Sequence, residues 1–261
     1  MPNPGVDQIP DGWSAGADSY AANFGALTRP FAVDAVRLLG VTAGMRVLDV
    51  AGGTGEASAA ARAAGGKVTA TDFADGMVES LRHRFAGDDD VQVRQMDGQN
   101  LDLPDATFDA AISMFGLMFF PDTQRGLREL HRVLRPGGRV AIGVWTSDFA
   151  VSRHIADALR KVLPTPPPLR PPTWAPFAAD LAGNLAAAGF DNVEVHEVSH
   201  HWTFEDPAAF FVSARVWSPP LRMMTDAIGA EEFDRAAAAF ADAVTDAGGL
   251  TAVAPVAIGT R

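Results

Sequence analysis

One segment near the start of the chain, residues 46–56 with the sequence RVLDVAGGTGE, constrains the fold most strongly. An apolar stretch typical of a buried β-strand runs into a carboxylate, Asp49, and then into a turn with three glycines in residues 52–55. Glycine tolerates positive φ and has no Cβ, so such a turn lets the backbone approach a ligand closely. The alanine-rich residues 56–64 predict a helix after the turn. This arrangement indicates an α/β sheet that binds a small-molecule cofactor.

The spacing of the glycines narrows the cofactor type. A dinucleotide fingerprint needs G-x-G-x-x-G, but Ser58 stands where its third glycine would be. The next predicted strand, residues 67–72, ends in Asp72, and a carboxylate there can accept hydrogen bonds from both ribose hydroxyls. No lysine or arginine lies between residues 47 and 61 to hold a phosphate. These features argue against a nucleoside triphosphate and for S-adenosylmethionine (SAM).

Five motifs in order across residues 46–146 resemble the class I SAM-dependent methyltransferases, and most closely the ubiquinone/menaquinone-biosynthesis C-methyltransferase type. They are LDVAGGTG at 48–55, TDFADGM at 71–77, MDGQNLDLP at 96–104, FDAAISMFGL at 108–117 and RVLRPGG at 132–138. The sequence departs from the quinone type at residues 118–121, MFFP, which lack the polar residues expected there. Beyond Trp145, where substrate identity is mainly carried, the likeness fades.

The resemblance implies a cofactor role for each motif. Asp49 lines the methionine part, Asp72 takes the ribose hydroxyls and Asp97 accepts from the adenine amino group. Tyr20, the sole tyrosine, either contacts the SAM carboxylate or packs as a half-buried ring. The product would be S-adenosylhomocysteine (SAH). The full predicted cofactor-binding set is Tyr20, Asp49, Ala51, Gly52, Gly53, Thr54, Gly55, Asp72, Phe73, Met77, Asp97, Gly98, Gln99, Met114 and Phe115.

Composition excludes several classes of function. A net charge of −11 opposes a nucleic-acid role, because affinity for phosphate backbones comes from clustered lysine and arginine. The absence of cysteine excludes disulfides, thiolate metal sites and a cysteine nucleophile. No apolar run approaches the roughly 20 residues of a membrane span, and no signal peptide is visible. We therefore expect a cytoplasmic protein without stable membrane insertion, acting on a small molecule, with a homodimer as an open option.

The pattern along the chain predicts an α/β fold with a parallel sheet covered by helices on both faces. The resemblance implies a Rossmann-like, seven-stranded, mostly parallel sheet with an antiparallel last strand. Strands are expected at 47–50, 68–71, 91–96, 110–114, 140–145, 193–198 and 250–258, with a helix after each of the first four. Residues 17–39 predict two short helices broken by Pro30. We expect one domain over 1–261, with an N-terminal flap and SAM-binding core at 13–146.

Two segments interrupt the expected fold, residues 147–177 and 206–247, and we interpret both as caps over the substrate. They and the strand ends concentrate large apolar side chains, which suit an aromatic or isoprenoid-like acceptor. The alternative interpretation is packing of the caps on the sheet. The predicted acceptor-contacting residues are Phe119, Trp145, Trp174 and Trp217.

Methyl transfer needs a nucleophile aligned with the sulfonium, so a general base is optional. His154, in the first cap segment, is the candidate base, with a surface role as the alternative. His196 and His200 are four residues apart on a predicted strand, which places them about 13 Å apart and argues against a metal site.

The sequence therefore predicts a SAM-dependent methyltransferase acting on a small, largely apolar molecule, either a specialised metabolite or a quinone-like ring. Methylation at carbon, oxygen or nitrogen stays open. The first alternative is a SAM-fold protein that catalyses another reaction, such as a cyclisation, or none. A nicotinamide-dependent reductase is disfavoured by the missing third glycine.

Overall fold

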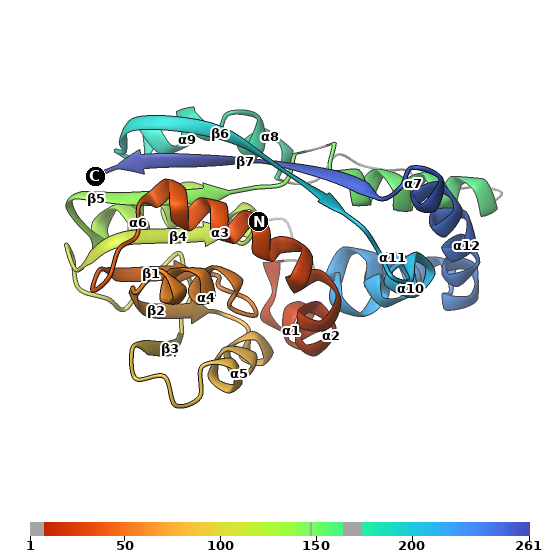
Figure 1. Ribbon diagram of the computed structural model, residues 1–261, viewed down its shortest axis with the longest axis horizontal. Helices are drawn as coiled ribbons and strands as arrows, with labels where there is room; N and C mark the ends of the chain where they lie inside the picture. The colour runs from red at the N-terminus through yellow and green to blue at the C-terminus, as the bar shows by residue number, and fades with distance from the viewer. Residues whose placement is uncertain (1–7, 147, 164–173) are drawn as a thin grey trace.

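A seven-stranded sheet forms the centre of the computed structural model, which describes residues 8–146, 148–163 and 174–261 (Figure 1). Its strand order is β3-β2-β1-β4-β5-β7-β6. The first five strands run parallel, and β7 lies antiparallel between β5 and β6. The predicted Rossmann-like fold with an antiparallel last strand is confirmed. The strands are β1 Arg46–Val50, β2 Lys67–Asp72, β3 Val91–Gln95, β4 Phe108–Met114, β5 Leu134–Gly143, β6 Asp191–Trp202 and β7 Leu250–Thr260.

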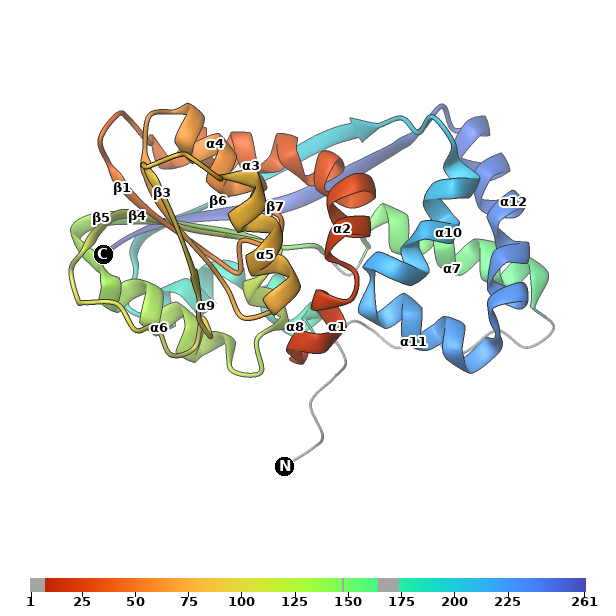
Figure 2. The ribbon, with the colours of Figure 1, turned by 90° about the horizontal axis from the view of Figure 1, so that it is seen from below.

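Helices cover both faces of this sheet (Figure 2). One face carries α3 (Ala26–Leu39), α4 (Glu56–Ala63) and α5 (Asp75–Arg84), and the other carries α6 (Thr123–Val133) and α9 (Leu181–Ala187), which follows the short α8 (Ala175–Ala179). Because both faces are covered, most residues of the central strands β1 and β4 are buried, and the majority of them are apolar. No described helix has the length and apolar character needed to cross a bilayer.

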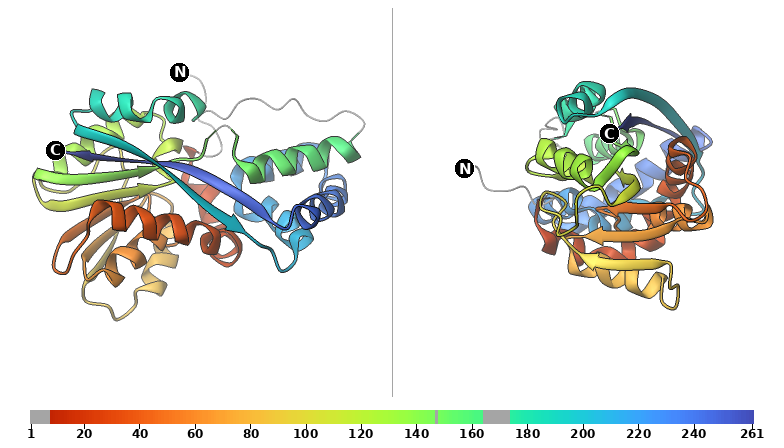
Figure 3. Two further views of the ribbon diagram at one scale, coloured as in Figure 1. Left: turned by 45° about the horizontal axis from the view of Figure 1, so that its top comes forward. Right: turned by 90° about the vertical axis from the view of Figure 1, so that its left-hand side faces the viewer.

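Four helices gather beyond the carboxyl ends of the parallel strands: α7 (Ala150–Val162), α10 (Pro207–Trp217), α11 (Pro219–Ile228) and α12 (Ala230–Asp246) (Figures 1 and 3). Fully buried rings of Phe211, Phe233 and Phe240 hold α10 and α12 together, with centroids 4.7 Å and 5.4 Å from Phe211. The long strands β6 and β7 reach toward this helical end (Figure 3). One apolar cluster therefore runs from the sheet into these helices.

The N-terminal segment differs from its prediction. It comprises α1 (Pro10–Ser14), α2 (Ala17–Tyr20) and a π-helical turn, Ala21–Gly25, which runs directly into α3. Pro30 lies inside α3 and does not break it. Proline clashes with the carbonyl four residues earlier, and here that carbonyl belongs to Ala26, where the wider π turn passes into the α-helix. The predicted break at Pro30 is therefore wrong.

The prediction of a helix after β3 is also wrong, because turns and loop occupy residues 96–107. Gly98, Asn100 and Pro104 favour turns over helix in this short polar stretch. The open loop leaves Asp97 and its neighbours free to face the carboxyl edge of the sheet. The proline-rich part of the first cap segment, residues 164–173, lies outside the described residues.

Candidate functional site

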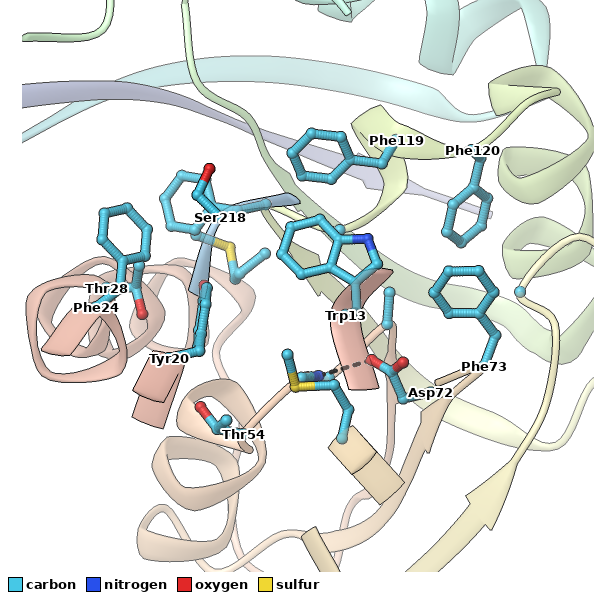
Figure 4. Close-up of a pocket in the computed structure, with 18 of the residues that line it drawn as sticks. Trp13, Tyr20, Phe24, Thr28, Thr54, Asp72, Phe73, Phe119, Phe120 and Ser218 are labelled. Carbon is cyan, nitrogen blue, oxygen red and sulfur yellow. Dashed lines mark hydrogen bonds between the residues drawn. The ribbon is translucent and has the colours of Figure 1, made fainter. Parts of the chain in front are cut away.

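A cavity of about 740 Å³ opens at the carboxyl ends of the parallel strands, between the sheet, the N-terminal helices and the helical end of the molecule (Figure 4). Its volume is typical of small-molecule sites. The cavity brings together the ends of β1, β2 and β4, the loop after β3, and side chains of α2, α7 and α10. Open α/β sheets bind ligands at this edge.

Asp72 ends β2 and is buried at the cavity wall. Its Oδ2 accepts a hydrogen bond from the Gly53 N–H at 2.9 Å (Figure 4). Its Oδ1 accepts one from the Ala74 N–H at 3.0 Å. Burial raises the pKa of Asp72 to about 6, although these hydrogen bonds favour the charged form. The carboxylate is thus fixed against the glycine turn, with remaining acceptor capacity facing the cavity.

Asp49 lies deeper in the same wall, with only 1% of its surface exposed. The Ser58 hydroxyl donates to its Oδ2 at 2.6 Å, while Oδ1 is buried and has no hydrogen-bond partner. The hydroxyl of Thr54 is also buried and unpartnered. Unsatisfied buried polar atoms are costly and call for a ligand or water. A free carboxylate oxygen and a free hydroxyl fit the ammonium and carboxylate of the SAM amino-acid end, so these residues fit the cofactor.

An ionic clamp that the sequence analysis missed holds the end of the glycine turn. Glu56, buried at the start of α4, pairs with Arg84 Nη1 at 2.5 Å and with Arg29 Nε at 3.0 Å. Arg84 Nη1 also donates to the Thr54 carbonyl at 2.7 Å. The three charges come from α3, α4 and α5, which are far apart in sequence, and only the fold brings them together. The clamp fixes the backbone beside Thr54.

Fourteen of the fifteen predicted cofactor residues line the cavity: ten lie at or after the ends of β1, β2 and β4, three lie in the loop after β3, and Tyr20 reaches it from α2. Gly55 does not line it. Its φ is +87°, and a Cβ there would lie 2.8 Å from the side chains of Leu81 and Phe85. Gly55 is therefore required by the turn and by packing against α5, and a contact with the cofactor is not evident.

Aromatic rings form the rest of the wall. Trp145 stacks between Phe115, with ring centroids 3.7 Å apart, and Phe149, at 4.2 Å. On the N-terminal side Phe24 stacks on Trp217 at 4.6 Å. The four predicted acceptor-contacting residues, Phe119, Trp145, Trp174 and Trp217, all line the cavity. Their role in binding an acceptor stays a prediction.

Phe24 and Phe149 were missed by the sequence analysis, although a simple signal was present. Phe24 lies one helical turn after Tyr20, and Phe149 lies four residues after Trp145. Thr28, one further turn after Phe24, also lines the cavity. Extending each predicted site residue by four positions would have found Phe24 and Phe149, and a second such step would have found Thr28.

His154 does not line the cavity. It is half-buried on α7, and its Nδ1 lies 2.9 Å from the Ala150 carbonyl oxygen one turn earlier. The structure therefore places the candidate base away from the acceptor space. No histidine, lysine or arginine occurs among the described residues that line the cavity. His200 pairs with Asp34 at 2.9 Å, on the outside of the site, and the described residues hold no cluster suited to a metal ion.

The two buried carboxylates predict a pH dependence of cofactor binding. Burial raises the pKa of both Asp49 and Asp72 to about 6, so near pH 5 each is about 90% protonated. Their folded pKa values exceed the unfolded value, so the contribution of these two carboxyl groups to the stability of the ligand-free protein falls as pH rises from about 4 to 6. A cofactor that pairs with the charged forms shows the opposite trend. We expect SAH affinity to fall about tenfold per carboxylate between about pH 7 and pH 5, measured by calorimetry.

Ser58→Ala sharpens this test, because it removes the hydroxyl that stabilises ionised Asp49 and leaves Asp72 unchanged. The midpoint of the affinity profile should move to higher pH. Asp72, Arg84 and the Ser58 backbone also act on the Asp49 charge, and they are retained in this variant. An affinity that stays constant across this range in the wild-type protein would contradict both carboxylate assignments.

Comparisons with known proteins agree with this geometry. A family model of a methyltransferase domain matches residues 48–142. A demethylmenaquinone methyltransferase of Clavibacter sepedonicus is 46% identical over 110 residues, 42% of this chain and 45% of that protein. The chain thus spans about half the length of the curated relatives it matches.

Solved structures share the fold over most of the chain. The cyclase SpnF superposes with a TM-score of 0.59 at 19% identity, covering 98% of this chain and 96% of that one. Phosphoethanolamine N-methyltransferase 2 of Haemonchus contortus, in complex with S-adenosyl-L-methionine, gives a TM-score of 0.56 at 16% identity, covering 89% and 52%. At these identities the likeness shows the fold alone. The chain thus matches a methyltransferase domain over residues 48–142 and is similar over 110 residues to a demethylmenaquinone methyltransferase.

Proposed function

We propose that this protein transfers the methyl group of SAM to a small, largely apolar acceptor with a quinone-like or similar aromatic ring. One observation carries the proposal: a single cavity joins an acid-lined half, with buried polar atoms left unpartnered, to a half walled by stacked aromatic rings. The first half suits the cofactor, and the second suits an apolar acceptor. The family's relatives named demethylmenaquinone methyltransferase support the ring type.

Three groups of residues would hold the cofactor. Asp72 and the loop at Asp97 would take the adenosine part, and Asp49 with Thr54 would take the amino-acid end. When bound, SAM supplies an electrophilic methyl on a sulfonium, whose S–CH₃ bond breaks as the bond to the acceptor forms, leaving SAH. The protein contributes alignment and exclusion of water. No histidine, lysine or arginine lines the described cavity, and the carboxylates Asp49, Asp72 and Asp97 are assigned to the cofactor, so water would take up the proton lost by the acceptor.

We also propose that the described parts of the two cap segments set acceptor specificity. Both segments contribute side chains to the cavity wall. Segment 147–177 contributes Phe149, Ile155 and Trp174, and segment 206–247 contributes Trp217 and Leu221. None belongs to a sheet strand. Changes in these segments should therefore alter the acceptor and spare the cofactor.

The test is a transfer assay with methyl-labelled SAM and a panel of naphthohydroquinones, phenols and aromatic amines. Label recovered in an acceptor, with an equal amount of SAH, supports the proposal. Asp72→Ala serves as the control with a weakened cofactor site. Binding of SAM without SAH formation, across acceptors that themselves bind, would instead favour a SAM-fold protein with another reaction.

A further inference from the structure

Trp174, whose side chain lines the cavity, carries an unused hydrogen-bond donor on its indole. Trp174 precedes α8, and its side chain lines the cavity. The ring meets the edge of Phe119, with centroids 5.2 Å apart and an interplanar angle of 74°. Its Nε1 is buried and makes no hydrogen bond. A buried N–H without a partner is rare in folded proteins and needs an explanation.

The other tryptophans show what is unusual here. Trp217, also on the cavity wall, donates its Nε1–H to Ser213 Oγ at 3.0 Å within α10. Trp202 also has a buried, unpartnered Nε1, but it does not line the cavity and lies among the rings of Phe31 and Trp145. Of the two fully buried, unpartnered indole donors in the described structure, only that of Trp174 belongs to a cavity-lining side chain.

The chemistry of this donor limits what can satisfy it. An indole N–H only donates, so its partner must be an acceptor atom. An anionic acceptor group would also need a cation to offset its desolvation, and no lysine, arginine or histidine lines the described cavity. The surrounding wall is aromatic, and the Phe119 ring packs against the indole in an edge-to-face contact. A neutral oxygen on an apolar ring meets all three conditions.

We propose that the Trp174 N–H binds a neutral oxygen of the methyl acceptor, such as a ring carbonyl or hydroxyl, and thereby selects and orients that ring. This inference rests on the proposed function, because it assigns the donor to the acceptor of the same cavity. It gives Trp174 a polar role beyond an apolar contact. The acceptor class is then an uncharged aromatic ring that carries oxygen.

The test compares two probes with the same ring skeleton, 1,4-naphthoquinone and naphthalene, by equilibrium dialysis against SAH-saturated protein. The chain has no cysteine for the quinone to alkylate. Wild-type protein should prefer the quinone. Trp174→Phe keeps an aromatic ring but removes the donor, so quinone affinity should fall about five- to tenfold while naphthalene affinity stays unchanged.

Trp217→Phe is the matched control, because the donor it removes is already bonded to Ser213. It should change the affinities for both probes by the same factor. Equal effects of Trp174→Phe on both probes, no effect on either, or no quinone preference in the wild-type protein would overturn the inference.

SAH titration of the same three proteins separates this inference from the proposed function. Equal SAH affinity in all three is expected. If wild-type protein fails to bind SAH, the proposed function falls. If only Trp174→Phe loses SAH affinity, the donor serves the cofactor, and the inference falls while the proposed function stands.

Discussion

Replacing Asp72 with alanine is expected to weaken SAH binding by on the order of 1.5 to 3 kcal/mol. The change removes a charge-assisted acceptor for the ribose hydroxyls. It also leaves the N–H groups of Gly53 and Ala74 without the carboxylate that now accepts from them. Both effects act on the same wall of the cavity, because Gly53 lies in the glycine turn.

Calorimetric titration measures this change directly. Asp102→Ala is the matched control, because it also removes one carboxylate but from a side chain that is 95% exposed and does not line the cavity. The control should keep wild-type SAH affinity. Unchanged affinity in Asp72→Ala would contradict the ribose assignment.

Replacing Trp145 with alanine should destabilise the fold by about 3 to 5 kcal/mol, the usual cost of truncating a large buried aromatic side chain. Trp145 is buried and stacks on both Phe115 and Phe149, and its edge contacts Phe31 at 5.4 Å. These partners come from β4, the start of α7 and α3, so the cavity left behind would lie between separate elements.

Urea denaturation at equilibrium gives the free energy of unfolding for this comparison. Met223→Ala, on the exposed face of α11, is the control and should change stability by less than about 0.5 kcal/mol. A Trp145→Ala protein as stable as the wild type would show that the aromatic stack does not contribute to the free energy of unfolding. The stacked wall would then need another explanation.

Local sequence patterns predicted the sheet and most of the cofactor wall. The acids Asp49, Asp72 and Asp97 each lie at or just beyond the end of a predicted strand, and the carboxyl ends of parallel strands meet at one edge. Their convergence thus follows from strand order alone. The sequence pattern marks Ser58 only as the residue that replaces a third glycine. Its hydrogen bond to Asp49 depends on the orientation of α4, which the pattern does not determine.

Contacts between distant segments could not be predicted in the same way. The Glu56 clamp joins residues 27 and 28 positions away, and the Phe24–Trp217 stack joins residues from the two ends of the chain. His154 is placed outside the cavity by the rotation of α7, which the apolar pattern did not fix. Pro30 was misjudged because a π-helical turn, which has no simple sequence signal, precedes α3.

The central claim is that the acid-lined half of the cavity binds SAM and its product. Titration of the wild-type protein with SAH at about pH 7, where Asp49 and Asp72 are largely ionised, tests it most directly. The account predicts saturable binding at one site per chain and none with NADP under the same conditions. Absence of SAH binding, or binding of NADP in its place, would contradict it.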